Sequence, residues 1–136
     1  MKELTMEALV QNIPAATDFV NAQLDEVGCS PAEEMEIDVV LDEVLSNIAN
    51  YAYTPKVGLV TIQVETEKDA PMVTISFADG GIPYNPLEQE APDVNVPLQK
   101  RKIGGLGIHL TKKLMDHVSY EYSEGKNILH IHKKMS

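Results

Sequence analysis

Two short runs of alternating apolar and polar residues, at 60–65 and 73–77, most restrict the fold of this 136-residue chain. An alternation with a period of two is typical of a strand with one buried and one exposed face. Only a short polar segment, from Glu67 to Pro71, separates the two runs, and this predicts a β-hairpin. Because a hairpin pairs its strands in opposite directions, we expect a mainly antiparallel sheet.

The other periodic segments predict three helices and three more strands around this hairpin. We expect the further strands at 4–10, 118–122 and 127–133 and the helices at 14–27, 31–52 and 104–116. Hairpin-joined strands and three helices that can cover one face predict an α+β fold. This fold is a two-layer α/β sandwich with a mainly antiparallel mixed sheet and helices on one face. The length predicts one domain, residues 1–136.

The composition excludes several classes of function. The chain has 21 acidic and 11 basic residues and a net charge of −10. This argues against a nucleic-acid partner, because such proteins need a basic surface. No apolar run is long enough for a membrane helix, and the N-terminal segment does not resemble a secretory signal. Cys29 is the only cysteine and cannot form an internal disulfide, so a reducing cytoplasm is the expected compartment.

The longest predicted helix carries the first candidate functional residues. Ser30 and Glu33 form a capping-box pattern around Pro31, which sets the start of this helix. At 100° per residue, Asn47 lies on the shoulder of the buried face, and Glu43 lies one turn earlier beside it. A carboxylate beside an amide at the edge of a core is a candidate functional pair. The same helix carries several other acids, so a solvated surface role for Glu43 remains an alternative.

A second candidate is Asp79, at the end of the predicted strand 72–79. It shares the apolar face of this strand, so its carboxylate is directed toward the layer between sheet and helices. Burying a carboxylate is costly unless it accepts hydrogen bonds. The donors could come from a ligand, such as the exocyclic amine of a purine, or from backbone N–H groups of the turn through Gly80 and Gly81. Both alternatives remain open at this point.

The third candidate is the glycine-rich segment 104–107 at the start of the last predicted helix. Glycines allow close backbone approach, and a helix N-terminus offers free N–H groups and a partial positive charge, which suits phosphate. Five of the 11 bases lie around it: Lys100, Arg101, Lys102, Lys112 and Lys113. We therefore expect this segment to bind a small anion, with a solvated charge run as the alternative.

In chain order, the three candidates resemble the N, G1 and G2 boxes of the histidine-kinase-like (Bergerat) ATPase superfamily. The matching segments are Glu43-Val44-Leu45-Ser46-Asn47, Asp79-Gly80-Gly81-Ile82-Pro83 and Gly104-Gly105-Leu106-Gly107-Ile108. More narrowly, the chain resembles the anti-sigma-factor serine/threonine kinases of bacterial partner-switching systems. The segment Pro83-Tyr84-Asn85-Pro86 and the Leu114-Met115-Asp116 tail of the last helix support this narrower resemblance.

The resemblance implies a role for each matching residue. Asn47 would bind Mg²⁺ through its amide oxygen, and Asp79 would accept a hydrogen bond from the adenine amino group. Glu43 would act as the general base on a serine hydroxyl of a partner protein. Asn127 stands near the place where family members often carry a threonine that contacts the base. The other implied ATP-binding residues are Gly81, Pro83, Arg101, Gly104, Gly105, Leu106, Gly107 and Ile108.

The function implied by the resemblance is that of a cytoplasmic ATP- and Mg²⁺-dependent protein-serine kinase. Its substrate would be an anti-sigma-factor antagonist protein. A sigma factor is a second partner that the resemblance allows, and relatives pair as homodimers. The alternative is a regulatory module that binds ATP and a partner protein but transfers no phosphoryl group. No nucleic acid or membrane partner is expected.

Overall fold

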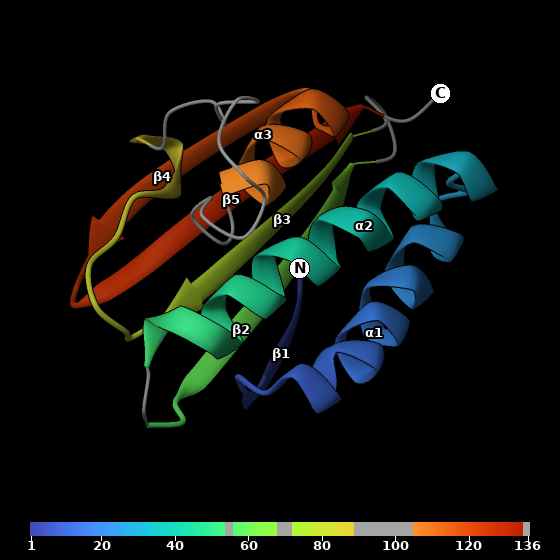
Figure 1. The fold of residues 1–136 in the computed structure, drawn as a ribbon. Helices are drawn as coiled ribbons and strands as arrows, with labels where there is room; N and C mark the ends of the chain where they lie inside the picture. The colour runs from blue at the N-terminus through green and yellow to red at the C-terminus, as the bar shows by residue number, and fades with distance from the viewer. Residues whose placement is uncertain (54–55, 68–71, 89–104, 135–136) are drawn as a thin grey trace.

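The computed structural model describes residues 1–53, 56–67, 72–88 and 105–134 (Figure 1). Its strands are β1 (Lys2–Glu7), β2 (Leu59–Glu67), β3 (Met72–Asp79), β4 (His117–Ser123) and β5 (Lys126–Lys134). Three helices, α1 (Ile13–Glu26), α2 (Pro31–Asn47) and α3 (Gly105–Leu114), lie on one face of the sheet. Shorter helical turns are η1 (Val10–Asn12), η2 (Ile48–Ala52) and η3 (Pro86–Glu88).

The five strands form one sheet in the order β1-β2-β3-β5-β4. The predicted hairpin is present as β2 and β3, in which Val64 pairs with Ile75. Each of the four neighbouring pairs is antiparallel. The predicted α+β sandwich is therefore confirmed, although the described strands contain no parallel pair of the kind that a mixed sheet would have.

The core lies between the sheet and the helices. Alternate residues of β2, β3 and β5 are buried against the helix layer. Phe77 is the largest of the fully buried side chains and is only 1% exposed. Truncating such a side chain to alanine costs about 3–5 kcal/mol, so this layer makes a large contribution to stability. The buried apolar residues of α2 are Ile37, Val40, Leu41, Val44 and Leu45.

The connection between α1 and α2 follows the sequence signals closely. Gly28 has a positive φ of 75° and ends α1, with Cys29 N donating to Leu24 O at 3.2 Å. Ser30 then caps α2: its Oγ accepts from Glu33 N at 3.2 Å, and its own N–H donates to Glu33 Oε1 at 3.1 Å. The predicted capping box is therefore confirmed, and it fixes where the long helix begins.

The first strand is shorter than the alternation at 4–10 predicts. β1 ends at Glu7, and Val10 lies in η1 with 54% of its surface exposed. Asn12 Nδ2 donates to Glu7 O at 3.0 Å, and Leu9 N donates to the same oxygen at 2.9 Å. These bonds turn the chain away from the sheet and into α1. The prediction that Val10 continues the inward side of the strand was therefore wrong.

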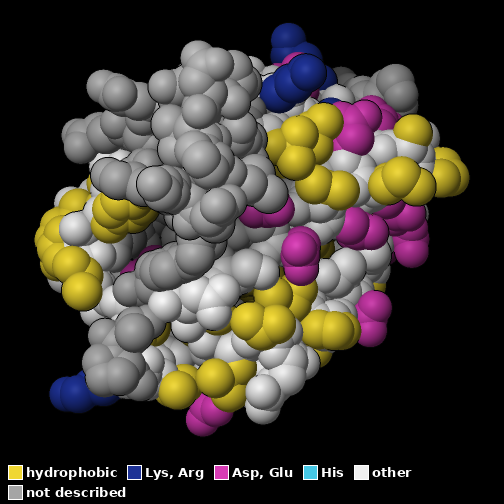
Figure 2. All heavy atoms as spheres, in the orientation of Figure 1, with side chains coloured by type: hydrophobic (Ala, Val, Ile, Leu, Met, Phe, Trp, Pro, Cys, Tyr) yellow, Lys and Arg dark blue, Asp and Glu magenta, His cyan; other side chains and the backbone are white. Residues whose placement is uncertain are grey.

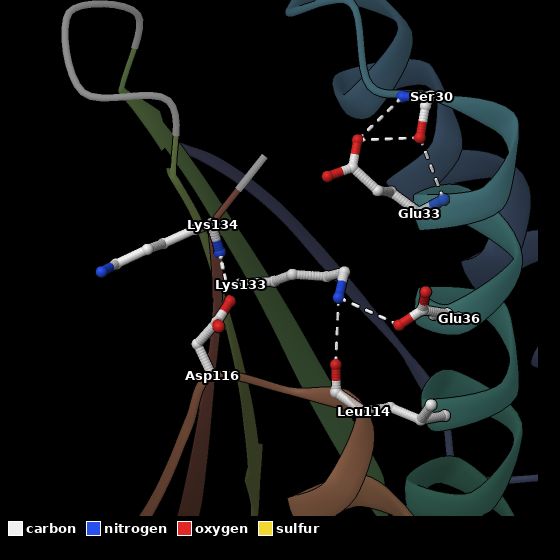
Figure 3. A network of polar contacts seen from close by, with 7 residues as sticks. All are labelled: Ser30, Glu33, Glu36, Leu114, Asp116, Lys133 and Lys134. Atoms are coloured by element: carbon white, nitrogen blue, oxygen red, sulfur yellow. Dashed lines mark hydrogen bonds and ion pairs between the residues drawn. The ribbon is translucent and has the colours of Figure 1, made fainter. Parts of the chain in front are cut away.

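The C-terminal end of α3 is joined to both layers by a buried lysine (Figure 3). Lys133 of β5 is 9% exposed, and its Nζ donates to Leu114 O at 3.0 Å and to Glu36 Oε2 of α2 at 3.1 Å. Next to it, Lys134 N donates to Asp116 Oδ2 at 2.6 Å. One side chain therefore links the last carbonyl of α3, the inner face of the sheet and α2.

Candidate nucleotide-binding site

The ends of three neighbouring strands, β2, β3 and β5, lie together at one end of the sheet. Asp79, the last residue of β3, pairs with Val60 near the start of β2 and with Asn127 near the start of β5. Asp79 and Asn127 are each only 6% exposed. As the alternation predicts, Asp79 lies on the inward face of β3. A buried carboxylate and a buried amide therefore lie directly opposite each other on the neighbouring strands β3 and β5.

The Asp79 carboxylate accepts two hydrogen bonds through one oxygen. Its Oδ1 lies 2.9 Å from Gly81 N and 3.1 Å from Asn127 Nδ2. Burial raises the pKa of Asp79 above its ordinary value, and these two donors oppose the rise because they stabilise the ionised form. The predicted turn-forming bond is thus present. It leaves Oδ2 outside both bonds, as an acceptor that a ligand could use.

Asn127 joins β5 to the segment that follows β3. Its Nδ2 donates to Asp79 Oδ1 and, at 3.0 Å, to Ile82 O. Its Oδ1 accepts from Tyr84 N at 3.0 Å and from the Tyr120 hydroxyl of β4. Because a backbone N–H can only donate and a carbonyl can only accept, these partners fix the orientation of the amide. No pattern in the sequence predicts the contact with Tyr120 or the number of hydrogen bonds that Asn127 makes.

Tyr53 holds the same turn from the helix layer. Its hydroxyl accepts from Gly80 N and donates to Leu59 O of β2 at 2.7 Å. Burial raises the pKa of Tyr53, so the hydroxyl remains protonated and able to donate. Because Tyr53 directly follows η2, it ties the end of the helix layer to the ends of β2 and β3.

Gly81 packs closely against the end of η2. Ile82 N donates to Ala52 O at 3.0 Å, and a Cβ at Gly81 would collide with the same carbonyl group. Glycine is therefore needed here for a close backbone approach within the protein itself. The role implied by the resemblance, approach of a base to Gly81, stays a prediction.

Glu43 and Asn47 lie one turn apart at the C-terminal end of α2, and both are partly buried. Within the described residues, no hydrogen-bond or ion-pair partner is found for either side chain. The sequence predicts a regular helix to residue 52, but α2 changes at Asn47 into the π-helical turn η2. Such turns occur frequently at functional sites. The contacts of Ala52 and Tyr53 described above hold this end of α2 beside the end of β3.

The glycine-rich segment lies at the start of α3. Gly105 and Gly107 are in its first turn, and α3 packs against α2. Lys112 Nζ also approaches Leu87 O of η3 at 3.4 Å. Pro83 is exposed on the segment after β3. Of the other predicted ATP contacts, Leu106 and Ile108 are described only as helical backbone, and Arg101 and Gly104 lie outside the described residues.

Charge is distributed unevenly between the helices. Residues 13–47, which contain α1 and α2, have no Lys or Arg. Figure 2 shows acidic side chains spread over this part of the helix layer. The acidic residues between positions 13 and 47 are Asp18, Asp25, Glu26, Glu33, Glu34, Glu36, Asp38, Asp42 and Glu43. In contrast, α3 carries Lys112 and Lys113 in its last turn. An approaching anion is therefore attracted to the α3 side of the site and repelled by α1 and α2.

Comparison with known proteins now identifies the family. The sequence model of the protein family described as the histidine kinase-like ATPase domain matches residues 6–133 of this chain. The chain belongs to the histidine kinase-like ATPase family. It is similar to the serine-protein kinase RsbW of Bacillus mycoides, with 26% identity over 134 residues, 90% of this chain and 82% of the relative. RsbW of Bacillus cereus gives the same identity and coverage.

A third relative is the serine/threonine-protein kinase BtrW of Bordetella bronchiseptica, 31% identical over 88 residues, 65% of this chain and 61% of the relative. The family that the three sequence boxes indicate is thus confirmed, and these relatives support its anti-sigma-factor kinase branch. Use of ATP follows from membership of an ATPase family. In the part of the chain that the structure describes, none of the helices has the length and apolar character needed to cross a membrane.

The residues present fit an adenine nucleotide chemically. Asp79, the last residue of β3, has a carboxylate oxygen that can accept a hydrogen bond, and the N-terminus of α3 can bind phosphate oxygens. The partly buried Asn47 amide is a hard oxygen ligand of the kind that Mg²⁺ prefers. These groups are among the residues that the sequence singles out, whereas Tyr53 and Tyr120, which bind Gly80 and Asn127, are not. Tyr120 alternates like a packing residue of its strand and Tyr53 directly follows the predicted helix, so no local pattern marks either hydroxyl as part of a site.

Proposed function

We propose that this ATPase-family protein is an ATP- and Mg²⁺-dependent protein-serine kinase of a partner-switching system. Its proposed substrate is an anti-sigma-factor antagonist protein. The observation that carries the proposal is the buried Asp79 carboxylate, which is 6% exposed and held through Oδ1 by Gly81 and Asn127. A polar arrangement of this cost at a strand end is explained best by a ligand donor for Oδ2.

In this proposal Asp79 Oδ2 accepts the adenine amino group, and the N-terminal turn of α3 receives the phosphates. Asn47, whose amide has no partner among the described residues, holds Mg²⁺ by its oxygen. ATP supplies the transferred phosphoryl group, and the metal offsets its negative charge. What the chain itself contributes is positioning and fixed dipoles, which dominate catalysis of phosphoryl transfer.

Glu43 is the proposed general base. It lies one turn before Asn47 on α2, is partly buried and has no ion pair among the described residues. Its carboxylate would therefore be free to take the proton from a serine hydroxyl of the substrate protein as that oxygen attacks. A well-placed general base contributes about 10²–10⁴ in rate.

The test uses the full chain, labelled ATP and an antagonist protein encoded beside its gene, with mapping of any phosphoserine. Glu43→Gln should bind ATP with unchanged affinity but transfer at least about 100-fold more slowly. Asp42→Asn is the matched control, because Asp42 is an exposed acid on the same helix; it should retain both properties. Equal transfer by Glu43→Gln and wild type would show that Glu43 is not the base.

The same experiment separates the kinase from the alternative function. A wild-type protein that binds ATP but phosphorylates no partner would support a regulatory ATP-binding module. A protein that binds no ATP would contradict the nucleotide site itself. We also propose that residues 1–136 form one domain acting in the cytoplasm. The same proposal includes a sigma factor as a second partner and the pairing of two copies of the chain. Binding measurements test the first point, and sedimentation measurements test the second.

A further inference from the structure

Asn127 uses its whole hydrogen-bonding capacity within the protein. An asparagine amide has two N–H donors and two acceptor lone pairs. The donors go to Asp79 Oδ1 and to Ile82 O, with Gly81 O as a longer contact at 3.4 Å, and the acceptor pairs go to Tyr84 N and the Tyr120 hydroxyl. All of these partners belong to the chain, and the side chain is 6% exposed. No group of Asn127 remains for a nucleobase.

We propose that Asn127 is a positioning residue that selects an amino-bearing purine without touching it. It does so by binding Asp79 Oδ1, which leaves Oδ2 as the acceptor offered to the ligand. This inference rests on the proposed nucleotide function, and it departs from the sequence-based expectation that Asn127 stands at a base-contacting position.

The chemical reason lies in what Oδ2 can do in each protonation state of Asp79. When the carboxylate is ionised, Oδ2 accepts, which suits the exocyclic amine of adenine. When it is protonated, the proton sits on Oδ2 because Oδ1 already receives two donors, and Oδ2 then donates. A donating Oδ2 suits a keto group, such as that of hypoxanthine. The Asn127 donor therefore favours the state that reads an amine.

Few of the described groups around Asp79 affect its protonation state. β2 presents Val60 opposite Asp79, the chain after η2 presents Tyr53, and β4 presents Tyr120 through Asn127. Among the described residues, the causes of the raised pKa of Asp79 include no charged side chain. Burial raises the pKa of Tyr53, so this side chain stays neutral, and the Asn127 and Gly81 donors are the groups that counter burial at Asp79.

The test compares two variants of nearly equal shape in the full chain. Asn127→Thr keeps a hydroxyl that can donate to Asp79 across the strand pair, whereas Asn127→Val keeps the shape and removes the donor. Binding of ATP and of inosine triphosphate, which carries a keto group in place of the amine, is measured from about pH 7 down to about pH 4. A hydrogen bond to a charged group corresponds to a factor of about 10 or more.

Wild type and Asn127→Thr should keep their preference for ATP to a lower pH than Asn127→Val, which should lose about tenfold of the ratio at a pH where its Asp79 is protonated and that of wild type is still ionised. Because Thr cannot also bond Ile82 and Tyr84, both nucleotides should bind more weakly to Asn127→Thr, with their ratio preserved. An unchanged ratio in a folded Asn127→Val, or equal losses of the ratio in both variants, would overturn the inference.

A second measurement needs no nucleotide. Carbon-13 titration of the Asp79 carboxyl should give a higher pKa in Asn127→Val than in Asn127→Thr and wild type, and equal values would overturn the positioning role. Failure of the proposed function has a different signature, namely a wild-type protein that binds neither nucleotide while the pKa of Asp79 still responds to the two substitutions. That outcome would support the positioning of Asp79 and remove its purine ligand.

Discussion

Replacing Lys133 by methionine removes the only donor that links Leu114 O and Glu36 in the network of Figure 3. Methionine has a similar length but no charge, so the change isolates the ammonium group. The two members of the ion pair differ in exposure. The Lys133 side chain is 11% exposed, whereas that of Glu36 is 39% exposed. Water can therefore replace the lysine at the half-exposed Glu36 carboxylate, whereas the ammonium group of Lys133 is itself buried.

This difference in exposure sets the expected magnitudes. A hydrogen bond made by a charged group contributes about 1.5–3 kcal/mol, so loss of the buried Lys133 ammonium in Lys133→Met should lower the free energy of unfolding by about 2 kcal/mol. Glu36→Gln breaks a half-exposed ion pair and should cost only about 0.5 kcal/mol. For a chain of this size the first loss lowers Tm by roughly 7 °C.

Urea unfolding of wild type, both single variants and the double variant gives the coupling energy of the pair. We expect a coupling below about 1 kcal/mol, because most of the loss comes from Leu114 O. A Glu36→Gln loss as large as that of Lys133→Met would refute this reasoning, since it would assign the stabilisation to the ion pair. No loss in Lys133→Met would refute it as well.

Two further predictions concern α2. Asn47→Ala should abolish the Mg²⁺-dependent part of the rise in Tm with ATP, whereas Asn47→Asp, which keeps an oxygen ligand, should retain it; equal loss in both would contradict the metal assignment. Burial, with some repulsion from Asp18, raises the pKa of Asp38 in the folded state, so its ionised form opposes folding above that pKa, and stability recovers as the pH falls through it. Asp38→Asn should therefore raise Tm at about pH 7 but not at about pH 3, unlike the control Asp42→Asn, and a pH-independent gain would contradict this sign.

Much of the fold could be predicted because its signals are local. Alternation defines β2, β3 and β5, and the Ser30–Glu33 capping box and Gly28 define the ends of the two long helices. Asp79 could be placed on the inward face because a strand has a strict period of two. These features depend only on residues a few positions apart.

The polar contacts around Asp79 could not be predicted, because they join residues far apart in the sequence. Asn127 is 48 positions from Asp79 and becomes its neighbour only through the β3–β5 register. The turn η2 was missed for a related reason. Ile82 and Gly80, which follow β3 in the other layer, bind the chain at the end of η2 through hydrogen bonds to Ala52 and Tyr53. The helical periodicity of residues 31–52 cannot predict contacts with residues so far along the chain.

The inner face of β5 connects the two ends of the candidate site. Along it, Asn127, Leu129, Ile131 and Lys133 alternate inward. Two apolar residues lie in the core, and at either end a buried polar residue binds a group that the proposed function requires in place: the Asp79 carboxylate at one end and the last carbonyl of α3 at the other. A shift of one residue would turn all four side chains to the opposite face. A shift of two would place a lysine or an asparagine against apolar core without its partners, at the cost of a buried unsatisfied group. We therefore infer that the polar ends of β5 specify its register, and that this register fixes the separation between the Asp79 carboxylate and α3, the two elements to which the proposed function assigns the base and the phosphates.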